Sequence, residues 1–124
     1  MATILLVDDD PDVLESLEAV LSLSGYGVIT KTGATEAIRT IEDGANVDLI
    51  VTDYRMPHMD GKEFLENLRL TAPAIPVIML SACGSVETYL VSIGLGAYEY
   101  INKPVLASEL RRVVNAALNG AGKS

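Results

Sequence analysis

The chain has 124 residues, of which 49% are hydrophobic, and it carries a formal net charge of −8 at pH 7. The length fits one domain, and the hydrophobic fraction argues against intrinsic disorder. The acidic balance argues against a surface for nucleic-acid phosphates, and a single cysteine, Cys83, excludes a disulfide bond within the chain. Met1-Ala2-Thr3 has no basic leader, and no apolar run approaches the ~20 residues of a membrane span, so we expect a cytoplasmic protein.

Short apolar runs alternate with longer amphipathic segments along the chain. The run at 4–7 is typical of a strand that is covered on both faces. Asp10-Pro11 predicts the cap and the first residue of a helix, which continues with apolar residues at helical spacing and ends at Gly25. We then expect a strand at 28–30, a helix at 34–42 and a strand at 49–52.

The same alternation continues in the second half of the chain. We expect a helix from near Gly61, a strand at 77–80, a helix at 86–93, a strand at 98–101 and a last helix around 110–118, with Ser108 as its candidate cap. This order predicts an α/β fold, a doubly wound parallel sheet of five strands with helices on both faces. Residues 1–119 would form one domain, and 120–124 would be a flexible tail or a linker stub.

Polar residues follow the predicted strands where each strand ends. They are Asp8, Asp9, Asp10, Asp53, Ser81 and Lys103. In a parallel sheet these ends share one edge, so the side chains converge there. Clustered carboxylates repel one another, and Mg²⁺ relieves this repulsion while keeping water ligands for a phosphate. Lys103 and Ser81 suit phosphoryl oxygens, which leaves Asp53 as a candidate carboxylate nucleophile.

These residues belong to motifs that occur in a fixed order along the chain. The motifs are Leu6-Val7-Asp8-Asp9-Asp10, Val51-Thr52-Asp53-Tyr54-Arg55-Met56-Pro57, Met59-Asp60-Gly61, Leu80-Ser81-Ala82, Gly96-Ala97 and Lys103-Pro104. With them the chain resembles the response-regulator receiver domains of two-component signalling, from Ile4 to Leu118. The resemblance implies a flavodoxin-like (βα)5 fold with strand order 2-1-3-4-5, which places the ends of strands one and three side by side.

The resemblance also implies roles for the residues at the sheet edge. Asp53 would be the phosphoacceptor, and Ser81 and Lys103 would contact the phosphoryl group and assist the reaction. The ligands implied for Mg²⁺ are Asp53, Asp9, Asp8 through water, and the backbone carbonyl of Arg55. Tyr100 would act with Ser81 as the switch residue, and the Lys103-Pro104 bond would be cis.

The partners implied by the resemblance are proteins. A sensor histidine kinase or a histidine phosphotransfer protein would donate the phosphoryl group. An output domain or partner protein would bind the face formed by the fourth helix, the fifth strand and the fifth helix. A homodimer formed on phosphorylation stays open, and we expect no direct binding to nucleic acid or to a membrane.

Simpler interpretations stand beside these roles. Asp10 is best explained as a helix cap, His58 as a loop residue, and Cys83 as a small packing residue. Tyr100 stays open between a core tyrosine and a switch. A metal-dependent phosphatase with an aspartyl-phosphate intermediate commonly has an acid two residues after its nucleophile, where this chain has Arg55. A pseudo-receiver without phosphotransfer is the third interpretation, although every pocket residue is present.

Overall fold

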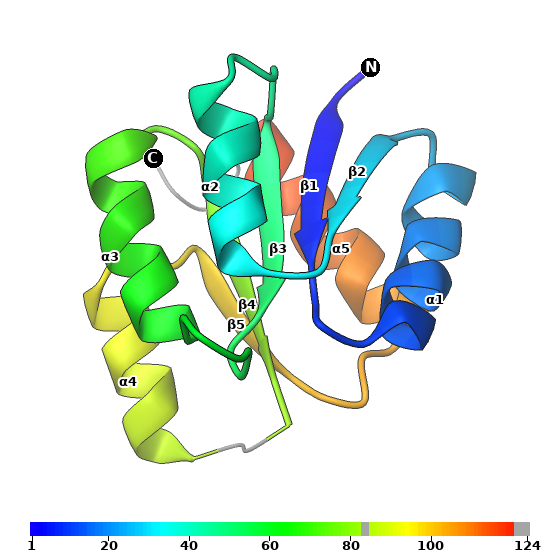
Figure 1. Ribbon diagram of the computed structural model, residues 1–124. Coiled ribbons are helices and arrows are strands. Elements are labelled where there is room, and N and C mark those ends of the chain that lie inside the picture. The colour runs from blue at the N-terminus through cyan, green and yellow to red at the C-terminus, as the bar shows by residue number, and fades with distance from the viewer. Residues whose placement is uncertain (83–84, 121–124) are drawn as a thin grey trace.

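The computed structural model describes residues 1–82 and 85–120. Its strands are β1 (Thr3–Val7), β2 (Gly27–Lys31), β3 (Leu49–Asp53), β4 (Val77–Ser81) and β5 (Glu99–Asn102). They form one parallel sheet in the order β2-β1-β3-β4-β5 (Figure 1). The predicted fold class and strand order are confirmed, although β5 begins one residue later than the sequence pattern suggested.

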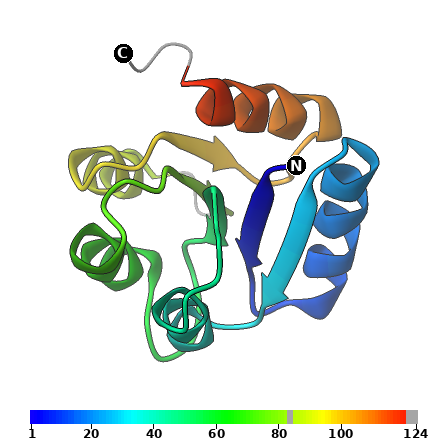
Figure 2. The ribbon, with the colours of Figure 1, turned by 90° about the horizontal axis from the view of Figure 1, so that it is seen from above.

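The helices form a layer on each face of this sheet. They are α1 (Pro11–Leu23), α2 (Ala34–Glu42), α3 (Gly61–Thr71), α4 (Val86–Gly94) and α5 (Ala107–Asn119). Helices α1 and α5 cover one face, and α2, α3 and α4 cover the other (Figure 2). Each layer encloses its own core, one centred on Leu6, Val51 and Leu110, the other on Val7, Ile50 and Phe64. The continuous apolar strands are explained by burial on both faces.

Of the two predicted helix caps, one is confirmed and the other is wrong. Asp10 caps α1, because its side chain accepts a hydrogen bond from the Asp12 amide at 3.0 Å. The prediction of Ser108 as a cap is wrong: α5 begins at Ala107, and its N-cap is Leu106, which has extended backbone angles. Ser108 therefore already lies in the first helical turn, where its own amide is one of the free donors.

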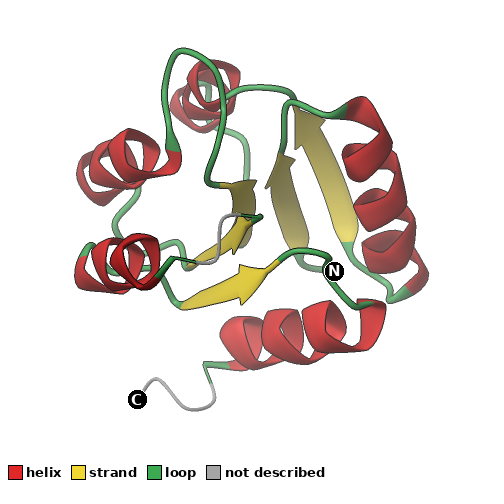
Figure 3. Cartoon of the chain, turned by 90° about the horizontal axis from the view of Figure 1, so that it is seen from below, coloured by secondary structure: helices red, strands yellow, loops and turns green. Residues whose placement is uncertain are grey.

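The loops after the strands gather at one edge of the sheet. The strands run downward in Figure 1, so this edge is the lower one, and Figure 3 views it from below. His58 lies in the loop after β3, as predicted, with a φ of 73°. The expectations for Cys83 and for the tail at 121–124 lie outside the described residues. Within the described part of the chain, none of the helices has the length and apolarity that crossing a bilayer requires.

Candidate functional site

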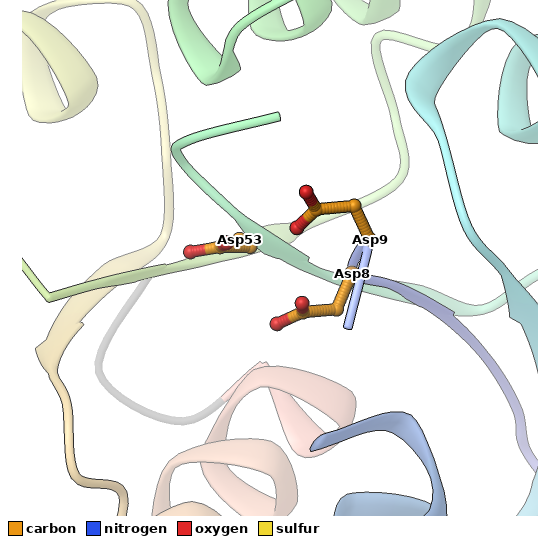
Figure 4. Close-up of side chains that lie close together, drawn as sticks. All are labelled: Asp8, Asp9 and Asp53. Carbon is orange, nitrogen blue, oxygen red and sulfur yellow. The ribbon is translucent and has the colours of Figure 1, made fainter. Parts of the chain in front are cut away.

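Three carboxylates meet where β1 and β3 end (Figure 4). Asp8 and Asp9 directly follow β1, Asp53 is the last residue of β3, and the two strands pair with Val7 opposite Thr52. One oxygen from each carboxylate lies within 4.8 Å of the others. Asp8 and Asp53 are only 1% and 7% exposed, whereas Asp9 is exposed. The predicted acidic cluster is therefore present, with one side open to water.

Lys103 completes the cluster from the loop after β5. Its Nζ lies 2.9 Å from Asp8 Oδ2 and 3.3 Å from Asp53 Oδ1. Its backbone amide donates to the Ser81 carbonyl at 2.8 Å, which fixes the loop against the end of β4. The Lys103-Pro104 peptide bond is cis, as the resemblance implies. A single ammonium group thus contacts two carboxylates that come from different strands.

Hydrogen bonds to backbone groups hold both the side chain and the backbone of Asp8 in place. Asp8 Oδ1 accepts from the Asp10 amide at 2.9 Å, and the Asp8 amide donates to the Lys31 carbonyl at 3.2 Å. Asp10 points instead to the start of α1, where it acts as the cap. The three consecutive aspartates therefore separate into two members of the cluster and one helix cap.

The charges of the cluster shift the pKa of two of its groups. Burial raises the pKa of Asp53, and the negative charges of Asp8 and Asp9 raise it further, against the opposing effect of Lys103. Burial alone would lower the pKa of Lys103, but its hydrogen bond to Asp8 and the charges of Asp53 and Asp8 raise it overall. The cluster therefore carries more negative charge than one ammonium group neutralises, and a further cation would be favourable.

The donor set of the cluster fits Mg²⁺. All three candidate ligand groups are carboxylates, which are hard oxygen donors, and the exposure of Asp9 leaves room for the water ligands that Mg²⁺ retains. An open cavity of about 500 Å³ adjoins Asp9 and is also lined by Arg55. This places Arg55 beside the cluster, and the metal contact of its backbone carbonyl stays a prediction.

Ser81 lies on β4, the strand next to Asp53, and Tyr100 lies on β5, one strand further along the sheet. Ser81 is fully buried at the end of β4, one residue beyond Leu80, which pairs with Asp53. The Tyr100 ring makes an edge-to-face contact with Tyr89 of α4, with a centroid separation of 5.7 Å. Tyr100 also packs against the core that α2, α3 and α4 cover, and its switch role stays a prediction.

Sequence reasoning assigned no role to two residues that border the site. Asp60 caps α3 by accepting from the Glu63 amide at 3.0 Å, and Thr88 of α4 lines the cavity together with Asp9. The spacing of Asp60 and Glu63 is a capping-box pattern that could have revealed the first role. The position of Thr88 depends on how α4 packs against β5 and α3, which no local pattern encodes.

Comparison with known proteins agrees with the geometry. The model of the response regulator receiver domain family matches residues 4–115. The transcriptional regulatory protein PrrA of Mycobacterium tuberculosis is 40% identical over 121 residues, which are 98% of this chain and 52% of PrrA. The chain spans only 26% of the Escherichia coli transcriptional regulatory protein GlrR, at 35% identity.

Solved structures give the same result for the fold. A CheY-like receiver domain from Methanospirillum hungatei superposes with a TM-score of 0.92 and 32% identity, covering 97% of this chain and 95% of that one. The beryllofluoride-activated NtrC4 receiver domain dimer gives a TM-score of 0.91 and 32% identity, with coverages of 97% and 98%. The chain therefore belongs to the response regulator receiver domains of two-component systems.

Proposed function

We propose that this domain is a phosphorylation switch in which Asp53 accepts a phosphoryl group from a histidine kinase or a histidine phosphotransfer protein. The observation that supports it is the arrangement of Asp8, Asp9, Asp53 and Lys103 at one edge of the sheet. The family membership favours this function over the phosphatase interpretation, and the complete cluster favours it over a pseudo-receiver.

The residues of the site match the needs of phosphoryl transfer. An Asp53 carboxylate oxygen attacks the phosphorus of a phosphohistidine, the P–N bond breaks, and the imidazole leaves with the bonding electrons and takes up a proton. Mg²⁺ held by Asp9, Asp53, Asp8 through water and the Arg55 carbonyl would neutralise charge on the phosphoryl oxygens. Water later hydrolyses the acyl phosphate and restores the carboxylate.

Lys103 and Ser81 would bind the new phosphoryl group. The Lys103 ammonium already lies 3.3 Å from Asp53 Oδ1, so a small movement brings it to a phosphoryl oxygen. The Ser81 hydroxyl is buried at the end of the adjacent strand and would donate to a second oxygen. Both contacts exist only after phosphorylation, so they supply the free energy that favours an altered conformation.

The altered conformation would be recognised on the face formed by α4, β5 and α5. Large apolar side chains are exposed on two of these elements: Val86, Tyr89 and Leu90 on α4, and Leu106 at the cap of α5. Tyr100 of β5 contacts Tyr89 and would report the movement of Ser81 to α4. An output domain, a partner protein or a second copy of the domain would bind there, in the cytoplasm.

Acetyl phosphate with Mg²⁺, followed by intact-mass measurement, tests the chemistry. We expect one added phosphoryl group on the wild-type protein and none on Asp53→Asn. The matched control is Asp43→Asn, which changes an exposed aspartate in the turn after α2. An unmodified wild-type protein, or equal modification of Asp53→Asn, would contradict the proposed function.

A further inference from the structure

Tyr54 and Tyr100 lie on the same face of the sheet. Both are partly buried and pack against the core that α2, α3 and α4 cover. Tyr54 directly follows Asp53, and its amide donates to the Leu80 carbonyl of β4 at 2.8 Å. Tyr100 pairs with Met79 of the same strand. The residue attached to the phosphoacceptor and the switch candidate therefore both border β4.

Met79 is the strand partner of Tyr100, and its side chain also lies near Tyr54. A Cβ atom built on Gly61 would lie 2.8 Å from Tyr54 Cδ2, 2.9 Å from Tyr54 Cα and 3.0 Å from Met79 Sδ. The Gly61 amide also donates to the Tyr54 carbonyl at 2.6 Å. Gly61 is the first residue of α3, and because it has no side chain, the Tyr54 ring and Met79 can pack close to its backbone. This contact fixes the Tyr54 ring beside the strand partner of Tyr100.

The Tyr100 hydroxyl group is buried without a hydrogen-bond partner among the described residues. A buried hydroxyl without a partner is unfavourable, so a neighbouring hydroxyl that can reach it would stabilise the conformation in which they meet. Tyr54 brings a second phenol hydroxyl group to the same core. Its pKa is raised first by burial, then by the charge of Asp60, and also by its interaction with Tyr100.

We propose that Tyr54 is a positioning residue for Tyr100, and that its ring and hydroxyl group carry a movement of the Asp53 segment to Tyr100 and α4. The inference rests on the proposed function, because the movement begins at phosphorylated Asp53. Tyr54 is the next residue in the chain and is tied to β4 and to α3 by its backbone, so it shifts with the end of β3. A hydrogen bond between the two hydroxyl groups would then satisfy Tyr100.

Fluorine NMR of protein labelled with 3-fluorotyrosine tests the inference. The Tyr100 signal is assigned from the spectrum of Tyr100→Phe and followed during titration with beryllofluoride and Mg²⁺. We expect Tyr54→Phe to move the Tyr100 signal and to raise the beryllofluoride concentration at half change about five- to tenfold, the loss typical of one hydrogen bond. Tyr26→Phe is the control, because Tyr26 packs against the opposite core.

Two further measurements separate the coupling from a general effect on folding. Tyr100→Phe should move the Tyr54 signal in return, and the double variant should be no weaker than either single variant. Uptake of one phosphoryl group from acetyl phosphate should be the same in Tyr54→Phe and wild type. A Tyr100 signal in Tyr54→Phe that matches the signal in Tyr26→Phe would overturn the inference, even with normal phosphorylation. Failure of wild-type phosphorylation would instead overturn the proposed function.

Discussion

Asp8, Asp9 and Asp10 are adjacent in the chain but differ in exposure and in partners. Asp8 is buried and paired with Lys103, Asp9 is exposed beside the cavity, and Asp10 caps α1. The cap was predictable, because Pro11 marks the first helical residue. The difference between Asp8 and Asp9 was not predictable, because it depends on a lysine that lies 95 positions later in the chain.

Replacement of Asp53 by asparagine should stabilise the fold at pH 7 without Mg²⁺. The pKa of Asp53 is raised from 3.8 by burial and by Asp8. Ionisation of this carboxyl group is therefore less favourable in the folded state than in the unfolded chain. The folded state then loses stability as the pH rises through the raised pKa, and no penalty exists below pH 3.8. We expect Asp53→Asn to gain about 1 kcal/mol at pH 7 in urea unfolding.

The pH dependence provides the control for this variant. The higher stability of Asp53→Asn should disappear below pH 3.8, where the carboxyl group of the wild-type protein is also neutral. Asp43→Asn should show no such trend, because Asp43 lies exposed in the turn after α2. A less stable Asp53→Asn at pH 7 would mean that the pair with Lys103 outweighs burial.

Removal of the Lys103 ammonium should weaken both the fold and the phosphorylation response. Lys103→Ala leaves the Asp8 carboxylate buried without its cation, which we expect to cost about 2 kcal/mol. The raised pKa of Lys103 means that its contribution is present at pH 7 and is lost only as the pH rises through that pKa. Lys62→Ala breaks the exposed pair with Glu66, which water screens, and should leave the free energy of unfolding almost unchanged. If urea unfolding showed equal losses of stability in Lys103→Ala and Lys62→Ala, Lys103 would not be the cation that stabilises buried Asp8.

At the scale of elements, the start of α3 depends on a glycine. A side chain at Gly61 would approach the backbone of Tyr54 to 2.9 Å, and a backbone atom cannot move away as a flexible side chain can. Gly61→Ala should therefore destabilise the domain by about 2 kcal/mol or more. Gly94→Ala is the matched control at the end of α4, where a Cβ meets nothing within 4 Å. It should gain about 0.5 kcal/mol by helix propensity. Thermal unfolding of both variants distinguishes these opposite signs.

The predicted elements were most accurate where the signal is local. All five strands and the start of α1 followed from apolar runs and from Asp10-Pro11. The start of α5 did not, because Leu106 holds the cap position without a side-chain hydrogen bond. The features that accompany this helix start are the extended backbone of Leu106 and the burial of Leu110 and Val113. No capping residue in the sequence marks it.

At the scale of the whole molecule, the parallel sheet brings separate chain segments to one edge. The sequence predicted the convergence of Asp8, Asp9, Asp53 and Lys103, since each follows a strand and the strands are parallel. It did not predict the side walls of the site, to which Thr88 of α4 contributes. Those walls depend on the packing of α4 against the sheet, which is a tertiary property.

The edge that collects these carboxylates should make the stability of the whole domain depend on Mg²⁺. A ligand that binds only the folded state stabilises it by about 2.7 kcal/mol when its concentration is one hundred times its dissociation constant. We expect thermal unfolding to shift upward with MgCl₂ and not with NaCl of equal ionic strength. Asp9→Ala should remove most of this shift, because Asp9 supplies the exposed carboxylate of the cluster. Asp43→Ala changes the net charge equally but lies in the turn after α2, and it should keep the wild-type response. A magnesium shift in Asp9→Ala equal to that in Asp43→Ala would place the ion outside the cluster.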